Sequence, residues 1–114
     1  MRRDEAYLLD VLIAAQKVLK FVSGLTEAEF RKSDLVQSAV MGQLEIIGEA
    51  CRRVSPAIQD AHPEIPWAAI VGMRNKLIHE YFRIDVSILW EVVQRDIPEL
   101  VTLVEPLVPP DVGQ

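Results

Sequence analysis

The sequence predicts an all-α fold, an up-and-down bundle of about four main helices with additional short helical turns. Apolar residues recur at three- and four-residue spacing over long stretches, and helix-capping patterns stand at the starts of several of these stretches. No segment shows the two-residue alternation of a half-buried strand. The chain has 114 residues, half of them apolar, which suffices for one hydrophobic core.

The first amphipathic stretch covers residues 4–23, where the apolar positions repeat with the period of a helix. Gly24 follows this stretch and is a signal for its end. Thr26 and Glu29 then have the spacing of a capping box, in which each side chain accepts a hydrogen bond from the other residue's amide. We therefore expect a short helix after Thr26.

A second amphipathic stretch covers residues 34–54 and begins with Asp34, a residue type suited to N-capping. Its apolar stripe is wider than one neighbouring helix would cover. A stripe of this width is expected for a central helix, or for a helix shared with a second subunit. The sequence leaves both possibilities open.

The second half of the chain contains a short helix, a break and two longer helices. Ser55 and Pro56 form an N-cap and first-turn pattern. Prolines then bracket a break, after which we expect a helix over residues 66–81. Asp85 can cap a final helix. Pro98 should kink or divide this helix, because proline lacks the amide hydrogen that a helix interior uses.

The composition indicates one soluble domain. We expect the helical domain to span residues 1–107, and a loosely ordered tail to span 108–114. No secretory signal or membrane-length apolar run is visible, and the single cysteine, Cys51, cannot form an internal disulfide. We therefore expect a reducing, cytoplasmic location, with Cys51 as a small buried residue. No metal-ligand spacing suggests zinc, and no cofactor is expected.

The net charge of −5 disfavours a protein that coats nucleic acid with its whole surface. A local basic cleft remains possible, because five of the twelve basic residues could come together in the fold. These residues are Arg52, Arg53, Arg74, Lys76 and Arg83.

The candidate functional residues lie near the end of the predicted helix 66–81. Arg74 falls inside the apolar stripe of this helix, where an arginine requires an explanation because its guanidinium group stays charged. Asn75 and His79 share one face, and Tyr81 points to nearly the same side as Arg74. His79 lies about 140° from Arg74 around a regular helix. We therefore favour a site to which two subunits contribute.

These residue types suit the cleavage of a phosphodiester. His79 can move a proton near neutral pH, and Arg74 can hold a phosphate and stabilise charge in a transition state. Asn75 would orient the reacting groups, and Tyr81 would donate a hydrogen bond. In RNA, a base near the 2′-hydroxyl allows it to attack the adjacent phosphorus atom without a metal ion.

Each residue also has a structural alternative. Arg74 could form a buried or interfacial ion pair with a helix carboxylate such as Glu45 or Glu49. His79 could be a capping or core histidine near a helix end. Tyr81 could be a core aromatic residue with its hydroxyl at the surface.

Residues 72–82, with the sequence GMRNKLIHEYF, resemble the signature of HepT-like proteins, a branch of the HEPN ribonucleases. Residues 44–50, 63–67 and 96–100 resemble the family in the same order and spacing. The resemblance extends from about residue 4 to residue 107. It implies an all-α HEPN-like bundle.

The family pattern is an arginine, four residues of which the first is polar, a histidine, any residue and a tyrosine, and no position departs from it. The resemblance implies that Arg74 and His79 form the catalytic pair of a metal-independent RNA endonuclease in a homodimer cleft, assisted by Asn75. It implies a type VII toxin, silenced by an MntA-like nucleotidyltransferase antitoxin. That partner would transfer AMP from ATP onto Tyr81.

Two other functions remain open at this stage. The chain could be a non-catalytic helical dimer that acts as partner or regulatory target of a nucleotidyltransferase. It could also be a simple structural helical module, in which case Arg74 would be ion-paired away from any cleft.

Overall fold

Helices make up most of the chain in the computed structural model, which describes residues 2–80 and 85–110, and no strand occurs within these ranges. The prediction of an all-α fold is confirmed. The long helices are α1 (Arg2–Val22), α3 (Asp34–Arg53) and α5 (Trp67–His79). The shorter ones are α2 (Glu27–Lys32), α4 (Pro56–Ala61), α6 (Val86–Glu91) and α7 (Ile97–Val104).

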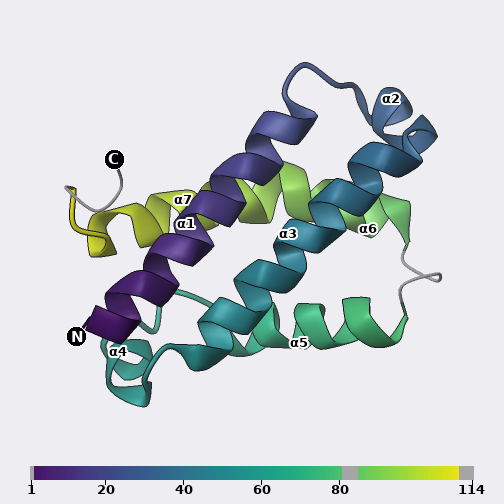
Figure 1. The fold of residues 1–114 in the computed structure, drawn as a ribbon. Helices are drawn as coiled ribbons and strands as arrows, with labels where there is room; N and C mark the ends of the chain where they lie inside the picture. The colour runs from purple at the N-terminus through teal and green to yellow at the C-terminus, as the bar shows by residue number, and fades with distance from the viewer. Residues whose placement is uncertain (1, 81–84, 111–114) are drawn as a thin grey trace.

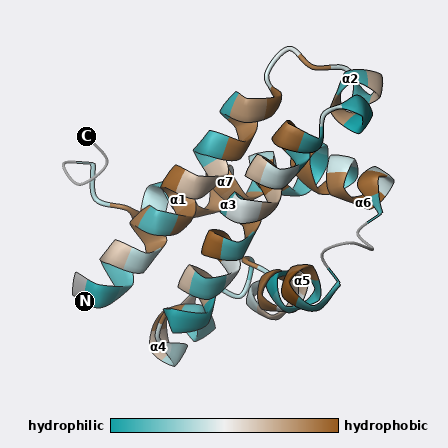
Figure 2. Cartoon of the chain, turned by 45° about the vertical axis from the view of Figure 1, so that its right-hand side comes forward, coloured by the Kyte–Doolittle hydropathy of each residue, from teal (hydrophilic) through white to brown (hydrophobic). Residues whose placement is uncertain are grey.

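Helix α3 occupies the centre of the arrangement (Figure 1). It packs against α1 on one side and against α5 on another, while α7 packs against α1. Apolar residues from all the long helices meet between them, and Figure 2 shows hydrophobic and hydrophilic segments alternating along the helices. Leu35 and Ile46 of α3 nevertheless remain 81% and 46% exposed. Part of the wide stripe therefore has no cover within the described residues.

The connection between α1 and α3 follows the predicted capping signals. Gly24 has a φ of +79°, a conformation that glycine adopts without strain, and α1 ends just before it. The amide of Thr26 donates to Glu29 Oε1 at 2.9 Å, and the amide of Glu29 donates to Thr26 Oγ1 at 3.1 Å. The capping box is confirmed, and it starts α2.

The N-cap of α3 is Ser33, so the assignment of this role to Asp34 was wrong. Ser33 has extended backbone angles, and its Oγ accepts a hydrogen bond from the amide of Val36 at 3.1 Å. Asp34 lies in the first turn instead, where a negative charge is favourable near the positive end of the helix dipole.

A buried aspartate ties the beginning of α1 to the beginning of α4. Asp4 is 3% exposed, and its Oδ1 and Oδ2 accept hydrogen bonds from the amide and hydroxyl of Ser55 at 2.8 and 2.7 Å. The hydroxyl of Ser55 also accepts from the amide of Ile58, and Pro56 follows it in the first turn of α4. The predicted N-cap at Ser55 is confirmed.

The final helix is divided, as Pro98 predicts. Asp85 caps α6 by accepting a hydrogen bond from the amide of Ser87 at 2.8 Å. A π-helical turn then spans Val92–Asp96, and the amide of Ile97 donates to the carbonyl of Val92. Pro98 therefore falls in the first turn of α7, where a missing amide hydrogen costs little.

The end of the described chain stays close to the core. A 3₁₀ turn covers Glu105–Leu107, and Val108, the first residue of the predicted tail, is buried. Residues 111–114 of that tail lie outside the described residues. None of the helices described here has the length and apolar character needed to cross a membrane.

Candidate functional site

A glycine of α3 allows α5 to bring Arg74 unusually close. A Cβ atom placed on Gly48 would lie 2.1 Å from Cβ and 2.6 Å from Cγ of Arg74. Both of these atoms are near the backbone of α5, so they cannot swing away as the tip of a side chain could. Gly48 therefore sets the distance between the two helices at the position where Arg74 leaves α5.

The guanidinium group of Arg74 is held between two neighbours. Its Nη2 lies 3.3 Å from Oε1 of Glu49, and its Nη1 donates to Oδ1 of Asn75 at 3.1 Å. The side chain is 27% exposed. Its Nε is buried and has no hydrogen-bond partner in the part of the chain that the structure describes. A buried donor left unpaired costs about 1–3 kcal/mol, so stability alone does not account for an arginine here.

Glu49 binds two further arginines. Its carboxylate accepts from Nη2 of Arg52 at 2.8 Å and from Nε of Arg53 at 2.7 Å. Hydrogen bonds from Arg52 and then from Arg53 lower the pKa of Glu49 to about 2. Three guanidinium groups thus share one carboxylate, and we call Glu49, Arg52, Arg53 and Arg74 the arginine cluster.

The arginine cluster borders an open surface pocket of about 420 Å³ between α1, α3 and α5. Its wall combines charged residues with apolar ones, and Ile46 and Ile78 are 46% and 45% exposed there. The lining consists of Tyr7, Asp10, Gly42, Glu45, Ile46, Glu49, Ala50, Arg53, Arg74 and Ile78. The pocket can therefore receive a ligand that offers both an anionic and an apolar part.

The other predicted site residues take different positions. Asn75 is exposed beside Arg74 and contacts it, as described above. His79 is the last residue of α5 and is exposed, and no hydrogen bond or ion pair joins its side chain to another described residue. Tyr81 lies outside the described residues. The structure thus joins Arg74 to Asn75 by a hydrogen bond, and no side-chain contact within the described residues joins His79 to either of them.

The predicted basic cleft forms in part. Arg52, Arg53 and Arg74 meet at Glu49, whereas Lys76 is exposed on α5 and Arg83 lies outside the described residues. Glu49 was one of the two partners foreseen for Arg74. The sharing of this carboxylate by Arg52 and Arg53 was not predicted. Their three- and four-residue spacing from Glu49 is nevertheless a signal for ion pairs on a helix.

The geometry of the described residues supports neither Cys51 as a nucleophile nor a metal-binding group of side chains. Cys51 is fully buried, and desolvation raises the pKa of its thiol to about 12, so it is not poised as a nucleophile. Within residues 2–80 and 85–110, no group of three or more His, Cys, Asp or Glu side chains is placed to hold a metal ion.

The fold and the pocket define a small all-α protein with an arginine-centred cleft on its surface. A family model described as "Ribonuclease HepT-like" matches residues 11–107. The chain belongs to this HepT-like family.

Curated relatives agree with this assignment. The chain is 40% identical over 105 residues to "Putative RNase MJ1380" of Methanocaldococcus jannaschii, a match covering 91% of this chain and 96% of that protein. It is 40% identical over 99 residues to "Probable ribonuclease HepT" of Thermococcus cleftensis, covering 87% and 90%. A relative from Caldanaerobacter subterraneus subsp. tengcongensis, "Putative RNase TTE0752", is 37% identical over 100 residues, covering 88% and 89%. No solved structure matches the chain.

Proposed function

We propose that the protein is a metal-independent RNA endonuclease of the toxin type. The observation that carries this proposal is the position of Arg74. Its stem packs on Gly48, its side chain lines an open pocket, and its buried Nε has no hydrogen-bond partner among the described residues. Membership of the HepT-like family and the names of the relatives support RNA as the substrate. Arg74 and His79 would be the catalytic residues, with Asn75 orienting Arg74.

The chemistry follows from the two side chains. His79 would take the proton of a 2′-hydroxyl, whose oxygen then attacks the adjacent phosphorus atom. The 5′-oxygen of the next nucleotide leaves and takes up a proton from water, which gives a 2′,3′-cyclic phosphate and a 5′-hydroxyl end. Arg74 would bind the non-bridging phosphate oxygens and stabilise the charge that develops on them. Asn75 accepts a hydrogen bond from Arg74, which restricts the guanidinium group to one orientation.

A homodimer would complete the site. Arg74 lines the pocket, whereas His79 is at the end of α5 and is not one of the lining residues. The half-exposed Ile46 and Ile78 beside the pocket are suited to burial against a second copy. In such a dimer, His79 of one copy could act on a phosphate held by Arg74 of the other.

The test is RNA cleavage by the purified protein in the presence of a chelator. The wild type should cut RNA, and His79→Ala should lower the rate by about 10²–10⁴-fold, the usual contribution of a general acid or base. Arg74→Ala should cause a loss of similar size. His62→Ala is the matched control, because His62 lies in the loop after α4 and pairs with Glu64. Cleavage that His79→Ala leaves unchanged would contradict the proposal.

Regulation by a partner belongs to the same proposal. An MntA-like nucleotidyltransferase antitoxin would silence the protein by transferring AMP from ATP onto the Tyr81 hydroxyl, with pyrophosphate as the leaving group. The motif position of Tyr81 and the family assignment support this step. Intact-mass measurement after incubation with such an enzyme and ATP should show one AMP adduct. The adduct should be absent from Tyr81→Phe.

The alternative function is a non-catalytic helical dimer that serves as partner or target of a nucleotidyltransferase. The ion pair between Arg74 and Glu49 favours it, because the arginine already has a charged partner. This alternative predicts that the wild type cuts no RNA. Arg74→Ala and His79→Ala would then change only stability or assembly.

A further inference from the structure

A second depression adjoins the pocket at Arg74. It is lined by residues from the first turns of α1, the last turn of α3 and the start of α4, namely Arg3, Asp4, Tyr7, Arg52, Arg53 and Ser55. Tyr7 and Arg53 line both hollows. The two hollows therefore adjoin at Tyr7 and Arg53, with Arg74 in one and Arg3 in the other.

The balance of acidic and basic residues differs between the two hollows. The pocket at Arg74 also contains Asp10, Glu45 and Glu49, so its acidic residues outnumber its basic ones. The second depression contains three arginines and one acid, Asp4. Asp4 is buried, and both of its carboxylate oxygens already accept hydrogen bonds from Ser55. The second depression thus presents a clear excess of positive charge to solvent.

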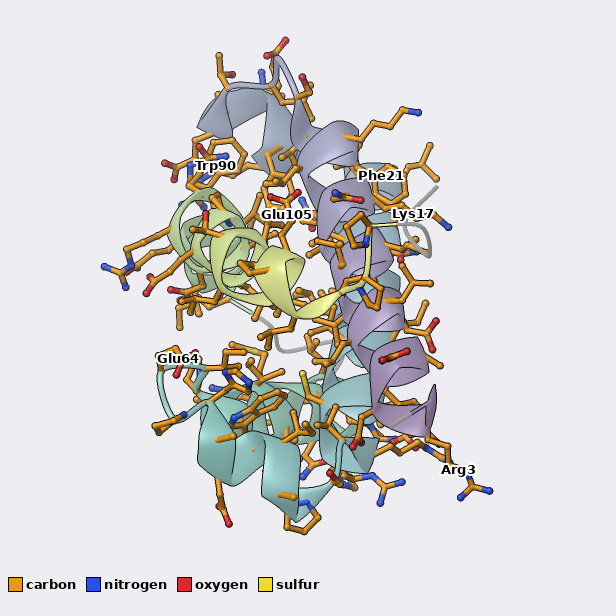
Figure 3. All side chains as sticks on the ribbon, turned by 90° about the vertical axis from the view of Figure 1, so that its left-hand side faces the viewer. Arg3, Lys17, Phe21, Glu64, Trp90 and Glu105 are labelled. Carbon is orange, nitrogen blue, oxygen red and sulfur yellow. The ribbon has the colours of Figure 1, made fainter. Side chains whose placement is uncertain are left out.

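The three arginines are accessible and partly oriented. The side chains of Arg52 and Arg53 are 53% and 52% exposed, although each contacts Glu49. The Glu49 carboxylate is divided among Arg52, Arg53 and Arg74, which leaves two positive charges of this group without an anion. Arg3 is exposed and projects away from the first turn of α1 (Figure 3).

We infer that this second depression is a binding subsite for the phosphodiester backbone of single-stranded RNA, with Arg3, Arg52 and Arg53 as its phosphate ligands. The inference rests on the proposed function, because it takes the scissile phosphate to lie at Arg74. Guanidinium groups bind phosphate oxygens through paired hydrogen bonds, and they act on any sequence. The subsite would supply the affinity that an acidic protein with a net charge of −5 cannot obtain from its whole surface.

The experiment measures RNA binding by fluorescence anisotropy over a range of salt concentrations. All proteins carry His79→Ala, so that the RNA stays intact. The subsite variant is Arg3→Gln/Arg52→Gln/Arg53→Gln, and a second variant replaces the same three residues with lysine. Arg95→Gln is the matched control, because Arg95 is an exposed arginine that pairs with Glu91 on the final helix.

The glutamine variant should bind an RNA of about 12 nucleotides roughly ten-fold or more weakly, with a log Kd versus log salt slope reduced by about 2. The lysine variant should keep most of the slope, because phosphate neutralisation needs charge. The Arg95→Gln control should match its parent.

An unchanged slope in the glutamine variant would overturn the subsite, and would leave these arginines as contacts for an acidic protein partner. Failure of the parent to bind RNA would overturn it as well. A third outcome is that RNA binding depends on these arginines but the wild type shows no His79-dependent cleavage. This outcome would contradict the proposed function and leave the subsite standing. Circular dichroism checks that each variant is folded.

Discussion

The position of the Arg74 side chain depends on its contacts with Gly48 and Glu49. Gly48 has no side chain, and this allows the stem of Arg74 to lie against α3. Oε1 of Glu49 lies 3.3 Å from one terminal nitrogen of the guanidinium group, and Oδ1 of Asn75 accepts a hydrogen bond from the other. The position of the arginine is thus set by contacts at its base and at its tip.

Gly48→Ala should destabilise the protein by about 1–3 kcal/mol, because the new methyl group would force α3 and α5 apart. The matched control is Gly42→Ala on the same helix, where a Cβ atom would meet nothing within 4 Å. That control should be neutral or gain up to about 1 kcal/mol, since alanine favours helix over glycine. Chemical denaturation measures both. Equal stability of the two variants would contradict the close contact.

The Asp4 carboxylate predicts a pH effect. The hydroxyl of Ser55 and then its amide lower the pKa of Asp4 below 3.8, so its ionised form is favoured in the folded state. The ionised Asp4 therefore stabilises the folded state at pH values above its ordinary pKa. This stabilisation is lost as the pH falls through the lower pKa that Asp4 has in the folded state. Asp4→Asn should cost about 1.5–3 kcal/mol at neutral pH and less at low pH.

Denaturation curves recorded from neutral pH downward measure the difference in stability between Asp4→Asn and the wild type. This difference should become smaller as the pH falls. Asp60→Asn, an exposed aspartate of α4, is the control and should follow the wild type throughout. A constant difference between Asp4→Asn and the wild type at every pH would show that the charge of Asp4 is not what Ser55 stabilises.

At the scale of elements, local rules account for most helix boundaries. The capping box at Thr26, the N-cap at Ser55 and the division at Pro98 are set by residues within one turn, so the sequence alone predicts them. The start of α3 was misassigned because a serine and an aspartate stand side by side, and both types cap helices. The extended backbone of Ser33 and its hydrogen bond from the amide of Val36 separate them.

Ser33→Ala should therefore lower the stability by about 1 kcal/mol, because the amide of Val36 loses its partner at the start of α3. Ser23→Ala is the control, since Ser23 is an exposed serine just after α1, and its change should stay within about 0.5 kcal/mol. Thermal unfolding measures both variants. A Ser33→Ala protein as stable as the control would return the capping role to Asp34.

At the scale of the whole molecule, the sequence predicts the all-α class well and the site only in part. An arginine in the apolar stripe of α5 was recognisable as unusual from its spacing. Its contact with Gly48 was not, because that depends on how α3 and α5 cross, and spacing within one helix carries no such information. The same limit applies to the meeting of Arg3 with Arg52 and Arg53, which come from opposite ends of α1 and α3.

The proposed dimer makes a prediction at this scale. Ile46→Glu should convert the dimer to a monomer in sedimentation and reduce RNA cleavage, because a charge would be placed on an apolar contact beside the pocket. Ile88→Glu is the matched control, since Ile88 is 47% exposed on α6 and lines no part of the pocket. A wild type that sediments as a monomer at micromolar concentration would contradict the shared site.

The close approach at Gly48 has a consequence for how relatives should vary. The contact involves Cβ of Arg74, an atom that every residue except glycine would also place there. Selection for the fold alone should therefore retain Gly48 in relatives that have lost the arginine. The side chain of Asn75 contacts Arg74 only at a guanidinium nitrogen, so Asn75 should become variable in the same lineages. Covariation across the family would thus separate the residue that maintains helix spacing from the one that serves the arginine.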